Sequence, residues 1–220
     1  MLDETKCESS TQNQSKLKKI LFLEGVDGAG KSTIARTVSR RLTESGVGNM
    51  VVNEGYPPEY GMLYKLDEKR GFRSSALAKL SYRFSRFNIA IHNAFHQKGQ
   101  VALFEGGLLN FYVQCQMDEI EESLINLYVN DLFSTLGGTK FGTVLLSTET
   151  SVIRHRLQSR PEPSRNDRNP QRWLKYKKGL REAFNNGVAT GELMELNTGT
   201  LSVDETAKAI MDFLGQAVRK

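Results

Sequence analysis

The chain is built around one short stretch, EGVDGAGKST, which runs from Glu24 to Thr33. Residues 25–32 of this stretch fit the pattern G-x-x-x-x-G-K-[ST] at every position. Residues 20–23 before it are all apolar and predict a short buried strand. Residues 34–42 after it carry apolar side chains at the spacing of one helix face. A strand, this loop and then a helix is the context in which the pattern binds phosphate.

The residue types in the loop explain why it would bind a phosphate chain. Glycines let successive backbone N–H groups curl around a phosphate, and the helix N-terminus adds a partial positive charge. We expect Lys31 to reach the β- and γ-phosphates and the Ser32 hydroxyl to bind Mg²⁺. The alternative is a flexible glycine loop that matches by accident. The residues expected to hold the phosphates are Gly25, Val26, Asp27, Gly28, Ala29, Gly30, Lys31, Ser32 and Thr33.

Short apolar runs alternate with amphipathic stretches along the rest of the chain. The runs predict strands at about residues 18–24, 50–52, 101–104, 144–146 and 193–196. The amphipathic stretches predict helices at about 31–45, 75–97, 150–158 and 170–186, one or two helices within 108–136, and a last helix capped by Ser202 or Asp204. This alternation predicts an α/β fold with helices on both faces of a parallel sheet. Ligands of such sheets bind beyond the carboxyl ends of the strands.

Length and composition limit the remaining possibilities. The 220 residues predict one domain at 17–220, preceded by a disordered leader or tag remnant at 1–16. A net charge of +5 suits anionic ligands without requiring nucleic acid. Cys7 and Cys115 are too few for a disulfide framework and predict free thiols. The sequence has no apolar run near the roughly 20 residues of a membrane span, and its polar N-terminus does not resemble a signal peptide. We therefore expect a cytoplasmic protein without membrane contact.

Two glutamates follow predicted strands. Glu105 comes directly after the apolar residues 101–104, where P-loop enzymes place an acidic residue that helps hold Mg²⁺. Glu54 follows the second strand, where it could orient or deprotonate an acceptor hydroxyl. The alternatives are a loop carboxylate without a task for Glu105 and an ion pair with a nearby arginine for Glu54.

A basic segment follows the fourth strand. Residues 154–182 hold ten Lys or Arg against three Asp or Glu, and residues 159–170 are irregular and rich in Arg and Pro. This composition suits a closing lid that brings guanidinium groups to a transferring phosphoryl group and excludes water. The alternatives are a solvated basic loop or a nucleic-acid patch.

The helix at 75–97 carries Tyr82 and Arg86, which are four residues apart and share one face. A ring beside a guanidinium could hold a base and its phosphate, while Phe84 and Phe87 serve the core. The three histidines have no metal-ligand spacing and are interpreted as structural or surface residues.

These features together resemble the thymidylate kinases. The resemblance is strongest in the loop at 24–33 and extends more thinly over about residues 18–217. Glu54 is similar in position to the glutamate of an Arg-Glu-Pro motif, although Asn53 and Gly55 flank it here. Tyr82 and Arg86 resemble the acceptor helix, in which an aromatic ring stacks on the base and an arginine contacts the monophosphate. Asp167-Arg168, with Trp173 and Tyr176 beyond it, resembles the end of the lid, and residues 197–201 resemble the loop that packs against adenine.

The resemblance implies a five-stranded parallel sheet with a lid, ATP and Mg²⁺ as cofactors and, commonly, a homodimer. The phosphate loop contains no arginine, so the resemblance points to members whose catalytic arginine comes from the lid. Arg160 and Arg165 are the candidates for that arginine, and Arg168 is expected to contact the donor nucleotide.

One departure from the family concerns the end of the third strand. The family usually has Asp-Arg-Tyr there, whereas this chain has Glu105-Gly106-Gly107. The carboxylate is kept, but the arginine that helps place the phosphates is absent. Two glycines would also open space beside the acceptor. The acceptor is therefore left open.

The sequence as a whole predicts an ATP- and Mg²⁺-dependent kinase. In it Lys31 holds the phosphates, Ser32 and Glu105 hold Mg²⁺, and Glu54, Tyr82 and Arg86 shape the acceptor site. The first-choice acceptor is a nucleoside monophosphate, in particular a deoxypyrimidine such as dTMP. The second is a bare hydroxyl, on a deoxynucleoside, a modified base within DNA or a small alcohol. Two other classes remain open: a non-catalytic ATP-binding module and a nucleic-acid-binding protein.

Overall fold

The computed structural model describes residues 19–53, 84–85, 88–91, 94, 100–135, 139–159, 170–188 and 191–218. Five strands form one sheet in the order β2-β3-β1-β4-β5, and every neighbouring pair is parallel. The strands are β1 (Lys19–Glu24), β2 (Asn49–Asn53), β3 (Val101–Glu105), β4 (Lys140–Ser147) and β5 (Glu192–Asn197). The predicted five-stranded parallel sheet is confirmed.

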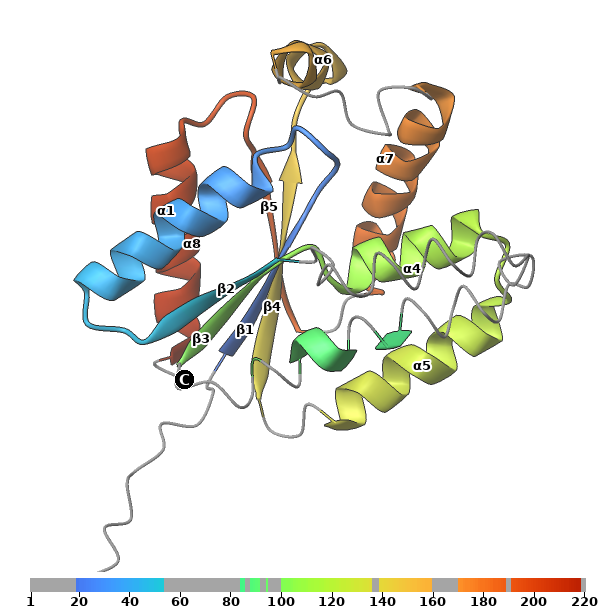
Figure 1. Cartoon of the computed structure of the whole chain (residues 1–220), viewed down its shortest axis with the longest axis horizontal. Helices are drawn as coiled ribbons and strands as arrows, with labels where there is room; N and C mark the ends of the chain where they lie inside the picture. The colour runs from blue at the N-terminus through green and yellow to red at the C-terminus, as the bar shows by residue number, and fades with distance from the viewer. Residues whose placement is uncertain are drawn as a thin grey trace, which may run out of the picture.

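Helices cover both faces of this sheet (Figure 1). Helices α1 (Lys31–Glu44) and α8 (Val203–Val218) pack together on one face, where Arg41 Nη2 lies 2.5 Å from Asp204 Oδ1. Helices α4 (Leu108–Met117), α5 (Glu122–Thr135) and α7 (Pro170–Asn185) lie on the other face, and α6 (Thr150–Gln158) follows β4. The stretch 108–136, expected to hold one or two helices, therefore contains two.

The central strand β1 supplies the core of both faces. All six of its residues are buried, and Leu21 and Leu23 contribute to one apolar cluster while Ile20 and Phe22 contribute to a second. The alternation follows from the pleat, which turns successive side chains to opposite faces. Continuous burial on both faces explains why residues 20–23 contain no polar side chain.

The strand register brings the ends of three strands to one edge. Leu23 in β1 and Asn53 in β2 are both paired with Glu105 in β3. The carboxyl ends of β1, β2 and β3 therefore lie along one edge of the sheet, the edge at which such sheets bind ligands.

The last helix begins with a capping box. Ser202 Oγ accepts a hydrogen bond from the Glu205 N–H at 3.2 Å, and the Glu205 carboxylate accepts from the Ser202 N–H at 2.9 Å. This arrangement satisfies backbone donors that a helix start leaves free. Of the two predicted caps, Ser202 is the one found, and Asp204 lies inside the first turn.

Several predictions fall partly or wholly outside the described residues. Within the helix expected at 75–97, residues 84–85, 88–91 and 94 are helical, and Ile91 and Ala94 are buried in the second cluster. The leader at 1–16, Cys7 and nearly all of the lid expected at 159–170 lie outside. Cys115 is buried in the core and is not part of a disulfide within the described residues. Within the described parts of the chain, no helix is long and apolar enough to cross a membrane.

Candidate functional site

The phosphate-binding pattern forms the loop between β1 and α1, as predicted. Its three glycines all have positive φ angles: +150° at Gly25, +84° at Gly28 and +99° at Gly30. Lys31 Nζ crosses the loop and donates hydrogen bonds to the carbonyls of Gly25 at 2.8 Å and Val26 at 3.2 Å. The lysine thus lies over the loop that the pattern assigns to the phosphates.

The first turn of α1 meets the end of β3. Ser32 Oγ donates a hydrogen bond to Glu105 Oε2, so the two predicted Mg²⁺ ligands lie side by side. Both offer oxygen, the ligand type that Mg²⁺ prefers, and Mg²⁺ usually takes only one or two protein ligands. In the described part of the chain, no cluster of three or more His, Cys, Asp or Glu could hold a metal. The Ser32–Glu105 pair therefore fits a magnesium ion whose other ligands are phosphate and water.

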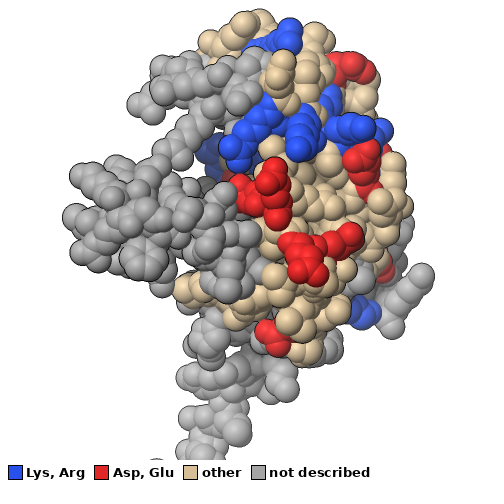
Figure 2. All heavy atoms as spheres, turned by 90° about the vertical axis from the view of Figure 1, so that its right-hand side faces the viewer, with Lys and Arg blue, Asp and Glu red and all other residues tan. Residues whose placement is uncertain are grey.

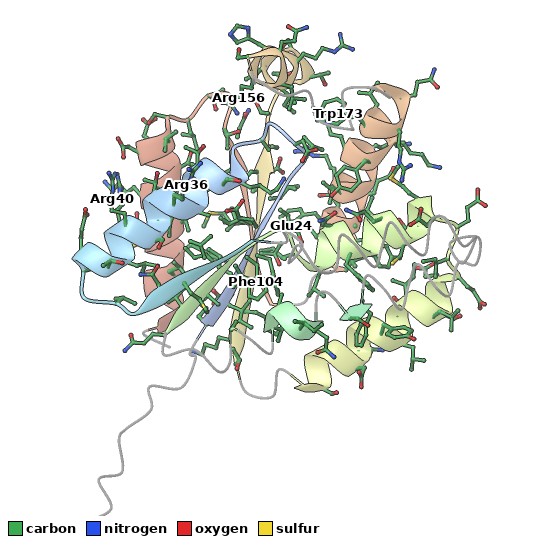
Figure 3. The ribbon with its side chains drawn as sticks, viewed as in Figure 1. Glu24, Arg36, Arg40, Phe104, Arg156 and Trp173 are labelled. Atoms are coloured by element: carbon green, nitrogen blue, oxygen red, sulfur yellow. The ribbon has the colours of Figure 1, made fainter. Side chains whose placement is uncertain are left out.

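Glu24 has a structural place that the sequence pattern did not indicate. It ends β1, its side chain is fully buried, and Oε1 accepts a hydrogen bond from the Leu109 N–H at 2.9 Å. Figure 3 shows Glu24 between the sheet and α4. A carboxylate at a helix N-terminus satisfies a free backbone donor and interacts favourably with the helix dipole. Glu24 therefore fixes α4 against the start of the phosphate loop.

The expectation that the glycines after Glu105 open space for an acceptor was wrong at Gly107. A Cβ at Gly107 would lie 2.5 Å from Cδ1 of Phe22, so the Phe22 ring already fills that volume. Gly106 has a φ angle of +103°, a conformation that other residues rarely adopt. Backbone shape and core packing thus account for both glycines.

The predicted basic segment 154–182 is divided among different elements. Arg156 belongs to α6, and its guanidinium donates to the Gly28 and Thr198 carbonyls at 3.2 and 2.7 Å. Arg181 belongs to α7 and forms an ion pair with Glu195 of β5. These two arginines link elements of the fold, so the sequence count overstated the charge that a lid could carry.

Helix α7 carries basic side chains and lies beside the end of β4. Figure 2 shows Lys and Arg side chains gathered on the face that α7 helps to form, above a group of acidic ones. Lys177 Nζ donates to the Thr148 carbonyl at 2.8 Å and to Thr150 Oγ1 at 3.2 Å, and burial lowers the pKa of this amine. The lysine thereby ties α7 to the loop that joins β4 to α6.

A cavity of about 460 Å³ lies between α7, the end of β4 and the start of the phosphate loop. Leu146, Leu174 and Leu180 contribute apolar walls, and Lys177 and Arg181 contribute basic ones. Since β1 lies between β3 and β4, the cavity is on the opposite side of the loop from Glu105.

The predicted site residues that the structure describes lie at the phosphate loop. The structure brings Lys31, Ser32 and Glu105 together there. The other predicted side chains lie outside the described residues: Glu54, Tyr82, Arg86, Arg160, Arg165 and Arg168. Their roles remain predictions. Sequence reasoning missed Glu24, Arg156 and Thr198 as parts of the loop's support, because each acts through a contact with a distant segment.

Solved structures of two kinases resemble this fold. No protein-family model matches the chain. A solved structure of deoxyadenosine kinase from M. mycoides with bound dATP superimposes with a TM-score of 0.59 at 18% identity, over 89% of this chain and 99% of that one. The thymidylate kinase from Ehrlichia chaffeensis superimposes with a TM-score of 0.56 at 15% identity, over 90% and 99%.

The chain has the fold of the P-loop kinases. Within that fold, the structural likeness does not single out thymidylate kinase, because deoxyadenosine kinase matches at least as well. Among curated proteins, the probable adenylyl-sulfate kinase of Bacillus subtilis strain 168 is 31% identical over an alignment of 128 residues, and this alignment covers 54% of this chain and 64% of that protein. The match to this curated relative thus spans less than two thirds of its length.

Proposed function

We propose that the protein transfers the γ-phosphoryl group of ATP to a nucleoside or nucleotide acceptor. The observation that carries the proposal is the phosphate loop with Lys31 above it and the Ser32–Glu105 pair beside it. All three named neighbours are called kinases, which supports phosphoryl transfer as the reaction class.

Each residue has a separate task in this proposal. The loop amides and Lys31 hold the β- and γ-phosphates, while Ser32 and Glu105 hold Mg²⁺. Held by these two residues, Mg²⁺ would supply positive charge against the negative charge of the transferred group. Arg160 or Arg165 adds a guanidinium to the same oxygens, and Glu54 orients the attacking hydroxyl or accepts its proton. Positioning and electrostatics, rather than covalent catalysis, therefore supply the rate enhancement.

The first candidate acceptor is a nucleoside monophosphate, in particular a deoxypyrimidine such as dTMP. It follows from Tyr82 and Arg86, which would hold the base and the monophosphate. Transfer to dTMP forms a bond from the γ-phosphorus to an acceptor phosphate oxygen and releases ADP.

The second candidate acceptor is the hydroxyl of a deoxynucleoside. It is favoured by the end of β3, where Gly106 and Gly107 stand in place of a phosphate-placing arginine. The Phe22 ring against Gly107 leaves no volume for a larger side chain there.

Measuring phosphoryl transfer to dTMP and to thymidine, in the wild type and in Arg86→Ala, distinguishes the two candidate acceptors. If the acceptor is a monophosphate, Arg86→Ala abolishes transfer to dTMP, since a dianion then lacks its guanidinium partner. Activity on dTMP that survives this change largely intact contradicts the first candidate. Transfer to thymidine but not to dTMP identifies the second, and tight ATP binding without any transfer identifies a binding module.

A further inference from the structure

Thr198 lies where β5 ends and the chain turns toward α8, and its side chain is 6% exposed. Its hydroxyl donates to the Ala29 carbonyl in the phosphate loop at 2.9 Å and lies 3.3 Å from the Ser147 carbonyl at the end of β4. Its backbone N–H also donates to the Ser147 carbonyl, at 2.8 Å. One residue thus joins the phosphate loop, β4 and β5.

Arg156, which is labelled in Figure 3, reaches Thr198 from α6. Its Nη1 donates to the Gly28 carbonyl at 3.2 Å and lies 3.3 Å from Thr198 Oγ1, while Nη2 donates to the Thr198 carbonyl at 2.7 Å. Two consecutive carbonyls of the phosphate loop, those of Gly28 and Ala29, are therefore held from outside the loop.

Holding a carbonyl also directs an amide. A trans peptide unit is planar, and its N–H points opposite to its C=O. With the Ala29 carbonyl turned out toward Thr198, the Gly30 N–H of the same peptide unit points the other way. The Gly30 N–H is one of the donors that the phosphate-binding pattern directs at phosphate oxygens.

We infer that Thr198, with Arg156 beside it, is a positioning residue that sets the shape of the phosphate loop for the triphosphate of the donor. Neither side chain needs to touch a phosphate in this role. The inference rests on the proposed function in one respect, that the loop binds the triphosphate. In this role, the loop from β5 to α8 holds the backbone of the phosphate loop in place through Thr198.

The test compares Thr198→Val, which keeps the shape but removes the hydroxyl, with Thr198→Ser, which keeps the hydroxyl. Thr43→Val is the matched control, because Thr43 is exposed near the C-terminal end of α1, away from the phosphate loop, and its Oγ1 donates to the Ser39 carbonyl of the same helix at 3.0 Å. The probes are ATP and inorganic tripolyphosphate, which has no base. We expect Thr198→Val to weaken the binding of both by about 10-fold, and both other variants to stay within about 2-fold of the wild type.

Tripolyphosphate separates positioning from other roles. If Thr198→Val weakens ATP but binds tripolyphosphate like the wild type, the residue acts on the base and the inference is overturned. If Thr198→Ser is as weak as Thr198→Val, the hydroxyl is not responsible and the inference is again overturned. Should Thr198→Val not fold, Arg156→Met is measured instead, with the same tripolyphosphate loss expected and unchanged affinity contradicting the inference.

Hydrogen exchange without ligand separates this inference from the proposed function. In Thr198→Val, amides of residues 25–33 should exchange faster than in the wild type, while those of β1 and β3 are unchanged. If the wild type binds neither probe, the proposed function fails, and the exchange result alone decides the inference. Unchanged exchange at residues 25–33 overturns it.

Discussion

Ser32 Oγ donates a hydrogen bond to the carboxylate of Glu105, and this contact joins the first turn of α1 to the carboxyl end of β3. Two oxygen-bearing side chains from segments far apart in the chain thus meet beside the loop that the sequence pattern assigns to phosphate. The strand register explains the meeting, because Leu23 at the end of β1 is paired with Glu105.

Replacing Glu105 by Gln should weaken the response of ATP binding to Mg²⁺. The neutral amide is a poorer ligand for a hard cation, and we expect the apparent affinity for Mg²⁺ to fall by about 10-fold or more. Calorimetric titration of ATP over a range of Mg²⁺ concentrations measures the effect. Glu44→Gln, at the exposed end of α1, is the control and should match the wild type. An unchanged Mg²⁺ dependence in Glu105→Gln would remove Glu105 from the metal site.

Replacing Gly107 by Ala should destabilise the protein by about 1–3 kcal/mol, because the new methyl group overpacks the core against the Phe22 ring. Gly215→Ala is the matched control, and we expect it to raise stability rather than lower it. A methyl group at Gly215, in α8, would point into open space, so alanine should stabilise the helix by about 0.5–1 kcal/mol. Urea unfolding measures both. Equal effects of the two substitutions would show that Phe22 does not explain Gly107.

Tyr112 should make stability fall at high pH. Burial is the larger cause and the 2.6 Å hydrogen bond to Glu122 the smaller one, and together they raise the pKa of Tyr112 from 10.0 to about 12. Between these values the folded state keeps a proton that the unfolded state has lost, so its contribution to stability is lost as pH rises from 10 to 12. In Tyr112→Phe this loss should be absent. Parallel urea titrations of the two proteins at pH 9 and pH 11 measure it, and identical pH dependence in both would refute the assignment.

Removing the cap of α8 should cost about 1 kcal/mol. Ser202→Ala deletes the acceptor of the Glu205 N–H and the hydroxyl that donates to the Glu205 carboxylate at 2.7 Å. Ser134→Ala in α5 is the control, since Ser134 is exposed and donates a local hydrogen bond to the Asp131 carbonyl, at 2.6 Å. Thermal unfolding compares the two variants. A larger loss in Ser134→Ala would contradict the capping box as the source.

Local signals made much of the fold predictable from the sequence. The four apolar residues 20–23 before a glycine-rich loop placed β1 within one residue of Lys19–Glu24. The strand β4 was predicted too short, at 144–146, because its first residues Lys140–Thr143 contain a charge and a glycine. Position 142 of the strand is a glycine because a Cβ there would lie 2.8 Å from the Phe213 ring. Phe213 belongs to α8, so the sequence around Gly142 does not reveal this contact.

The support of the candidate site was less predictable than its centre. Lys31 and Ser32 could be named from the motif, and Glu105 from its place after a strand. Thr198 could not be assigned to the phosphate loop, because 169 residues separate it from Ala29. Arg156 was counted with the lid because charge density does not reveal which arginines bond to backbone carbonyls.

The proposed function requires the phosphate loop to hold ATP for phosphoryl transfer. The most direct measurement follows the label from γ-labelled ATP into a pool of deoxynucleosides and deoxynucleoside monophosphates, with Mg²⁺ present. We expect transfer by the wild type and by Lys208→Met, an exposed lysine in α8. We expect a loss of about 100-fold or more in Lys31→Met, because the γ-phosphate loses its cation. Equal transfer by Lys31→Met and by the wild type would contradict the proposed function.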